Sequence, residues 1–174
     1  MGRFTDVRSI PGVYLLVDLD EKPLYVGQSG KLRGRLEQHF IRQDSSTTAD
    51  GLLDIYDVLR IYVWYAERDP AAPLDALEAA LYQRFPPRWD RAVPAFSGPL
   101  PDLTLDNADI TIGILDSPEQ LAVRREPLER IEAKLLHLLR AVRKAKIWGA
   151  SPAVRQALAR HAEELGDHFR RFLG

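Results

Sequence analysis

The sequence contains no cysteine among its 174 residues. The absence of cysteine excludes a disulfide framework, a cysteine-ligated zinc site and a cysteine nucleophile, so any chemistry must come from oxygen or nitrogen groups or from a metal ion that they hold. The sequence also lacks a run of roughly 20 apolar residues that could span a bilayer, and the N-terminus lacks the apolar segment of a signal peptide. These absences predict a cytoplasmic protein with no membrane partner.

An excess of positive charge is missing as well. The chain has 24 lysine and arginine residues against 25 aspartate and glutamate residues, which gives a formal net charge of −1. Proteins that bind nucleic acid usually carry a basic excess, so a nucleic-acid-binding surface on this chain must be local. The composition, 45% hydrophobic and 28% charged, is otherwise typical of a globular protein that can bury a core.

The first 95 residues predict a small domain of the α/β (α+β) class. Its expected strands cover residues 12–18, 24–27 and 58–65, and its expected helices cover residues 31–42 and 74–85. Runs rich in β-branched and aromatic residues indicate the strands, and apolar residues spaced three or four apart indicate the helices. We therefore expect a three-stranded antiparallel sheet, flanked by helices, whose first two strands form a hairpin.

Residues 96–174 predict a separate C-terminal extension. An irregular, proline-rich connection leads to an expected strand at residues 110–115, and two helices follow. The first helix begins at Pro118 or Pro127 and ends at Trp148, because proline is favoured at the first helical position. The second helix runs from Pro152 to about residue 172. Together the two helices predict a helical hairpin.

Two tyrosines of the first domain stand in short motifs on the expected hairpin. Tyrosine in a strand usually serves packing, and neither residue alone indicates catalysis. However, Gly12-Val13-Tyr14 and Tyr25-Val26-Gly27 resemble the two halves of the signature of the GIY-YIG nuclease superfamily, with valine in place of isoleucine. The resemblance covers residues 12–90.

Further positions extend this resemblance in the same order along the chain. The segment from Tyr25 to Leu36 resembles the UvrC-like endonuclease domain, whose essential arginine corresponds to Arg35. His39 follows four residues later, as in the homing and restriction endonucleases of the superfamily. The segment from Glu78 to Asp90 resembles the helix that carries the metal-binding glutamate, together with the residues after it.

The resemblance implies a DNA endonuclease that uses Mg²⁺ or Mn²⁺, with catalytic residues Tyr14, Tyr25, Arg35, His39 and Glu78. Glu78 offers the hard oxygen ligand that Mg²⁺ prefers, and Arg35 offers planar donors that fit phosphate oxygens. Tyr14 is the candidate general base, although a phenol has an ordinary pKa of about 10 and needs nearby positive charge for this role. Tyr25 would orient water or phosphate. His39 would share proton transfer or bind the phosphate.

Three more residues are candidates for contact with the substrate phosphate or for support of the catalytic residues. Gln28 stands where UvrC-like domains carry lysine, and Asp90 stands where the superfamily usually has asparagine. Asp90 could add a ligand to the metal site or support the existing one. Arg33 is the third candidate.

The first C-terminal helix has two expected faces. Apolar residues form a packing stripe, and basic residues gather nearly opposite it. The stripe comprises Leu128, Ile131, Leu135, Leu138 and Val142. The simpler interpretation of the basic face is a solvent-exposed surface. The alternative is a surface that contacts the DNA backbone through Arg130, Lys134, Arg140 and Lys144.

Two classes of function remain open. The first is metal-dependent cleavage of DNA in restriction, repair or phage defence, and a restriction enzyme would be expected to form a homodimer in order to cut both strands. The second is a non-catalytic module that keeps the GIY-YIG fold and binds nucleic acid or a protein.

Overall fold

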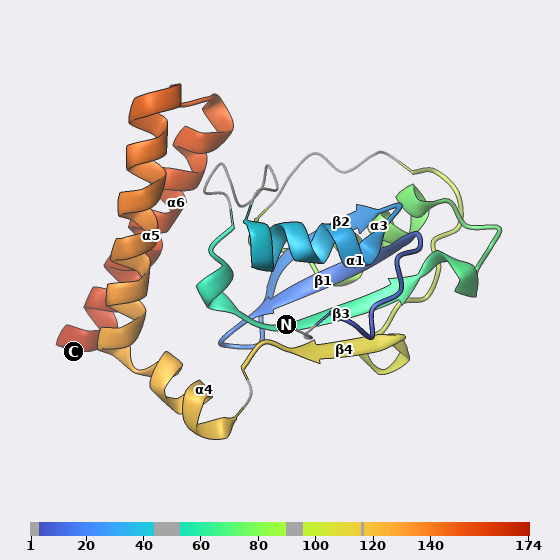
Figure 1. Cartoon of the computed structure of the whole chain (residues 1–174), viewed down its shortest axis with the longest axis horizontal. Helices are drawn as coiled ribbons and strands as arrows, with labels where there is room; N and C mark the ends of the chain where they lie inside the picture. The colour runs from blue at the N-terminus through green and yellow to red at the C-terminus, as the bar shows by residue number, and fades with distance from the viewer. Residues whose placement is uncertain (1–3, 44–52, 90–95, 116) are drawn as a thin grey trace. The chain divides into compact units, whose positions relative to one another are not determined.

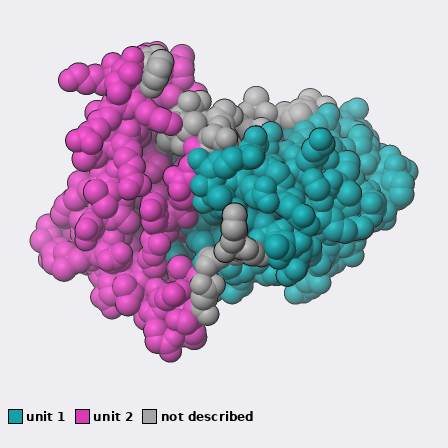
Figure 2. All heavy atoms as spheres, in the orientation of Figure 1, with its two compact units in different colours: residues 1–42, 58–114 teal, residues 43–57, 115–174 magenta. Residues whose placement is uncertain are grey.

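The computed structural model describes residues 4–43, 53–89, 96–115 and 117–174. These residues contain no helix that is both long and apolar enough to cross a membrane. The chain forms two compact units, which Figure 2 colours separately: residues 1–42 with 58–114, and residues 43–57 with 115–174. The division therefore differs from the expected boundary at residue 95, because residues 96–114 belong to the first unit.

The first unit contains a sheet of four antiparallel strands in the order β2-β1-β3-β4 (Figure 1). The strands are β1 (Gly12–Asp18), β2 (Pro23–Ser29), β3 (Val58–Tyr65) and β4 (Ile110–Gly113). The expectation of three strands was wrong, because the strand assigned to the C-terminal extension joins this sheet. Ile112 of β4 pairs with Ile61 of β3 and is buried. Thus β4 covers an edge of β3 that would otherwise present unpaired backbone groups.

Two helices cover the two faces of the sheet (Figure 1). Helix α3 (Leu74–Arg84) packs through Leu77 and Leu81 against the face that carries Val13 and Leu15. Helix α1 (Leu32–Glu37) lies over the opposite face and continues into a π-helical turn. Because side chains alternate along a strand, this second face carries the residues between those of the α3 face, Tyr14 among them.

The turn that follows α1 spans Gln38–Arg42, and the described ranges also contain 3₁₀ turns at Ile55–Asp57, Ala66–Arg68 and Leu105–Asn107.

The second unit is built around α4 (Pro118–Arg125), α5 (Pro127–Trp148) and α6 (Pro152–Leu173). Both prolines considered as the start of one long helix begin separate helices, since a proline lacks the N–H that would continue the preceding helix. Helices α5 and α6 form the expected hairpin (Figure 1). Gly149, at φ 83°, ends α5, and the Ser151 side chain caps α6 by accepting a hydrogen bond from Val154 N at 3.3 Å.

The packing face of α5 differs from the expected apolar stripe. Ile131 is buried as expected, but Leu128, Leu135 and Val142 are between 47% and 60% exposed. Ala141, which was not part of the stripe, is buried. The buried face is therefore rotated toward smaller and more polar residues, which leaves much of the apolar stripe facing solvent.

Candidate functional site

The pairing of β1 with β2 brings the two motif tyrosines together. Tyr14 lies opposite Gly27, and Tyr25 lies opposite Leu16, two positions further along. Since side chains two positions apart share a face, both phenol rings lie on the α1 side of the sheet. Their ring centroids are 6.0 Å apart, and both residues are buried.

Gly27 makes room for this arrangement. A Cβ atom at this position would lie 2.5 Å from Tyr14 Oη and 2.8 Å from Tyr25 Cε1. Both distances are far below a van der Waals contact, so a side chain here would displace the two rings. The second glycine of the signature is therefore explained by the close approach of the Tyr14 hydroxyl to the backbone of β2.

His39 joins the two tyrosines from the π-helical turn after α1. Its Nε2 atom lies 2.7 Å from Tyr14 Oη, and its ring centroid lies 6.0 Å from that of Tyr25. The imidazole is completely buried. Burial, and then the positive charge of Arg35, lower the pKa of His39 to about 4. At neutral pH the imidazole is therefore uncharged, and one hydrogen atom connects it to the phenol.

The two arginines of α1 have different surroundings. Arg35 is partly exposed and lies four residues before His39, near enough for its charge to act on the imidazole. Arg33 instead donates hydrogen bonds from Nε to the carbonyl of Val7 at 2.6 Å and from Nη2 to the carbonyl of Thr5 at 2.7 Å. The Arg33 side chain thus attaches the N-terminal segment to α1.

Glu78 lies on α3 and is completely buried. The Gln28 Nε2 atom donates to Glu78 Oε2 at 3.2 Å and to Asp75 Oδ1 at 2.7 Å. Gln28 directly follows Gly27 on β2, and because side chains alternate along a strand it lies on the α3 face of the sheet, whereas the two tyrosines lie on the α1 face. Asp75 was not among the expected site residues. Its position three residues before Glu78 places both carboxylates on one helical face, and this spacing could have revealed it.

The expected metal-ligand set can be compared with the structure only in part. Asp90 lies outside the described residues. Elsewhere in the described ranges, no three histidine or acidic side chains gather in a group that could hold a metal ion by themselves. Glu78 and Asp75 are the two carboxylates that accept hydrogen bonds from the Gln28 amide.

The placement of Lys134 on an exposed basic face was wrong. Lys134 is 1% exposed, and its Nζ lies 2.5 Å from Asp57 Oδ2, 3.0 Å from Glu164 Oε2 and 3.3 Å from Asp54 Oδ2. Burial alone would lower the pKa of Lys134, but the carboxylates more than offset it and raise the pKa above its ordinary value. The helical period placed Lys134 among the basic residues, but it could not show that three acidic partners meet it.

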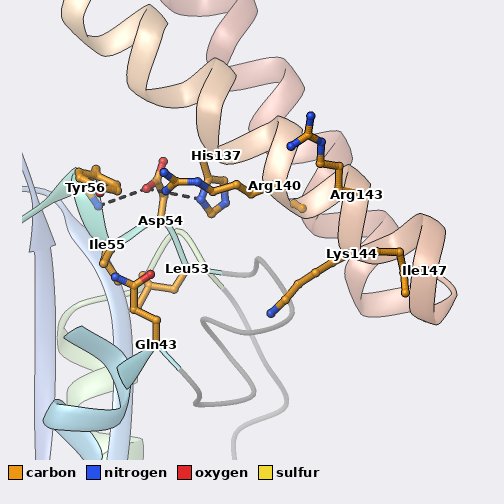
Figure 3. Close-up of a pocket in the computed structure, with 11 residues that line it drawn as sticks. Gln43, Leu53, Asp54, Ile55, Tyr56, His137, Arg140, Arg143, Lys144 and Ile147 are labelled. Carbon is orange, nitrogen blue, oxygen red and sulfur yellow. Dashed lines mark hydrogen bonds and ion pairs between the residues drawn. The ribbon is translucent and has the colours of Figure 1, made fainter. Parts of the chain in front are cut away.

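The other residues of the expected basic face vary in exposure. Arg140 and Lys144 are exposed and line a cavity of about 350 Å³ within the second unit (Figure 3). Asp54 and His137 lie in the same wall, with His137 Nδ1 3.5 Å from Asp54 Oδ1. Arg130 is half-buried. Of the four expected residues, Arg140 and Lys144 are therefore the two that the structure leaves exposed.

A comparison with protein families finds a match to part of the chain. Residues 10–90 match the family model described as the UvrC-like GIY-YIG domain, a family of endonucleases in general. No curated protein and no solved structure matches the chain significantly. The matched residues include all of β1, β2, α1, β3 and α3, and with them the paired tyrosines, Arg35, His39 and Glu78. The match supports the resemblance of residues 10–90 to the GIY-YIG nuclease superfamily, and it covers 81 of the 174 residues.

Proposed function

We propose that the protein is a metal-dependent endonuclease that hydrolyses phosphodiester bonds in DNA. The observation that carries the proposal is the 2.7 Å hydrogen bond between Tyr14 Oη and the buried, uncharged His39, within a domain of an endonuclease family. A phenol linked to a neutral imidazole can accept a proton from water while it passes on its own. Arg35 provides a permanent positive charge beside this pair.

We assign one task in hydrolysis to each of four residues: Tyr14, Tyr25, Arg35 and His39. Tyr14 Oη takes a proton from the attacking water, and the phenol proton moves to His39 Nε2. The water oxygen bonds to phosphorus as the bond between phosphorus and the leaving oxygen breaks, and the leaving oxygen keeps the electron pair of that bond and takes a proton from solvent water. Arg35 stabilises the negative charge that develops on the phosphoryl oxygens. The same negative charge stabilises His39 once the imidazole has taken the phenol proton and become positively charged. Tyr25, beside both rings, orients the water or the phosphate.

Glu78 is the residue that would hold Mg²⁺ or Mn²⁺. Its carboxylate is a hard oxygen ligand, and a single protein carboxylate suits Mg²⁺, which keeps several waters and takes further oxygens from the substrate. The Gln28 amide, bridging Glu78 and Asp75, fixes the orientation of the carboxylate. When bound, the ion supplies positive charge at the scissile phosphate.

Arg140 and Lys144 are the proposed contacts to the DNA backbone. Both are exposed, one helical turn apart on α5. Contacts to phosphates carry no sequence information and release counterions, so they would make binding weaken as salt increases. Measuring DNA binding of Arg140→Gln and Lys144→Gln over a range of salt concentrations tests this role. A salt dependence equal to that of the wild type would exclude it.

The test of the enzymatic proposal is cleavage of plasmid, single-stranded and branched DNA with Mg²⁺ or Mn²⁺. Arg35→Ala and Glu78→Gln are expected to lower the rate by about a hundredfold or more, since each removes a charge that acts on the transition state. The exposed Lys22, in the turn between β1 and β2, gives the control Lys22→Ala, which should cleave as the wild type does.

The pattern of products distinguishes the biological classes. Discrete fragments from plasmid would indicate restriction, and cleavage at branches alone would indicate a repair or defence nuclease that recognises DNA structure. If the wild type and both variants are equally inert on all three substrates, the protein is not a nuclease. The remaining candidate would then be a non-catalytic module that keeps the fold and binds nucleic acid or a protein.

A further inference from the structure

Four exposed hydrophobic residues lie along one side of helix α5 and form a stripe that differs from the one expected from the sequence. Leu128, Leu135, Leu139 and Val142 are 47% to 60% exposed, although each is a large hydrophobic residue. At 3.6 residues per turn, these four positions fall within an arc of about 60° around the helix. They recur at spacings of seven, four and three residues, which is the pattern of a helix that packs along a second helix.

Two exposed charges interrupt the stripe symmetrically. Glu132 and Lys146 lie on the same arc of α5, and both are exposed. Glu132 stands seven residues before Leu139, and Lys146 stands seven residues after it. Seven residues are about two helical turns, or roughly 10 Å along the axis. The stripe therefore has an apolar centre with opposite charges at equal distances from it.

We propose that this stripe of Leu128, Glu132, Leu135, Leu139, Val142 and Lys146 binds the same stripe of a second copy of the chain, with the two α5 helices antiparallel. A two-fold axis at Leu139 brings Glu132 of each copy opposite Lys146 of the other, so the contact gains two ion pairs around an apolar centre. A parallel arrangement would instead place identical charges opposite each other, which disfavours it.

The dimer does not depend on nuclease activity. Its surface belongs entirely to α5, whereas the proposed catalytic residues belong to the first unit. Association is measured on the full-length protein alone, without DNA or metal. An inactive protein could still dimerise, and an active one could be a monomer, so failure of one proposal is distinguishable from failure of the other.

Sedimentation equilibrium of the full chain tests the apolar centre. The wild type is expected to dimerise reversibly, and Leu139→Glu is expected to weaken dimerisation by about a hundredfold, since it removes apolar contact in both copies and places two carboxylates together. Val123→Glu, at a similarly exposed apolar residue of α4, is the control and should associate as the wild type does. Because Leu139 is half exposed, the variant should keep the circular dichroism of the folded protein.

Charge reversal tests the antiparallel orientation. Glu132→Lys and Lys146→Glu should each weaken dimerisation by about tenfold, because each puts like charges at both pairs. The double variant should restore the wild-type dissociation constant, and Glu163→Lys, an exposed position on α6, should leave it unchanged. A monomeric wild type, an undiminished dimer of Leu139→Glu, or a double variant as weak as the single ones would each overturn the proposal.

Discussion

At the scale of single residues, the arrangement of the candidate site depends on the space above Gly27. The Tyr14 hydroxyl occupies this space and from there reaches His39 Nε2 at 2.7 Å. A methyl group at residue 27 would force the phenol away from the backbone. The geometry of the Tyr14–His39 hydrogen bond is thus determined by the absence of a side chain on the neighbouring strand.

Gly27→Ala is accordingly expected to abolish most of the proposed nuclease activity at a modest cost in stability. Overpacking of this kind lowers the free energy of unfolding by about 1–3 kcal/mol, whereas misplacement of Tyr14, the proposed general base, would lower the rate of DNA cleavage by about a hundredfold. Gly34→Ala is the matched control: no atom lies within 4 Å of a Cβ at that helical position, so the change should stabilise by about 0.5–1 kcal/mol. Urea denaturation and cleavage rates of both variants provide the measurement. Equal activity of the two variants would contradict the explanation given for Gly27.

Much of this residue-scale arrangement could be predicted from the sequence. The alternation of strands predicted that Tyr14 and Tyr25 could share a face, and the order of the motifs pointed to His39. The hydrogen bonds of Gln28 to Asp75 and Glu78 could not be predicted, because they depend on how α3 lies against β2. Neither propensity nor periodicity specifies the position of one element on another.

At the scale of elements, local sequence predicted β1 and β3 with their observed ends. It failed where long-range pairing decided the outcome. The segment containing Ile110 and Ile112 was expected to form a strand. This strand belongs to the first unit because it pairs with the edge of β3, and the local sequence does not predict that pairing. In the same way, the helical period of α5 was correct, but the direction of its buried face depended on acidic residues about 80 positions earlier, around Asp57.

The buried ion cluster makes α5 sensitive to one charge. Removing the Lys134 ammonium would leave Asp54, Asp57 and Glu164 close together with their main cation missing. Lys134→Met is therefore expected to lower the free energy of unfolding by about 3–5 kcal/mol, the usual cost of breaking a buried ion pair from one side. Chemical denaturation followed by helical circular dichroism measures the change.

Lys144→Met is the control for this substitution, because Lys144 is an exposed lysine of the same helix. Its effect should stay within about 0.5 kcal/mol. If both variants unfold at the same denaturant concentration as the wild type, the cluster does not stabilise the second unit.

At the scale of the whole molecule, each unit contains one buried histidine with a low pKa. Burial and the charge of Arg35 lower the pKa of His39 to about 4, and burial with the charge of Arg130 lowers that of His168 to about 4. Both histidines bind protons more readily in the unfolded chain, where the pKa is about 6.5. The contribution of each to stability is therefore complete above pH 6.5 and decreases as the pH falls toward 4.

For His39 the pKa difference corresponds to a contribution on the order of 3 kcal/mol. Asp57 acts in the opposite direction, because burial raises its pKa, so the total stability of the wild type does not isolate the histidines. The informative quantity is the difference in free energy of unfolding between the wild type and His39→Gln or His168→Gln. This difference should grow in favour of the wild type as the pH rises from 4 to 6.5 and should stay constant above that range.

Titration followed by NMR of the imidazole protons checks the same assignment directly, with midpoints near pH 4 for His39 and His168 in the folded protein. A midpoint near 6.5 for His39 would mean that the imidazole is neither desolvated nor close to the charge of Arg35. At neutral pH part of the imidazole would then carry a proton already, and that fraction could not accept the Tyr14 proton in the proposed transfer. Because His168 belongs to the second unit, a normal midpoint there would leave the catalytic proposal untouched. The two histidines thus report separately on the two units of one chain.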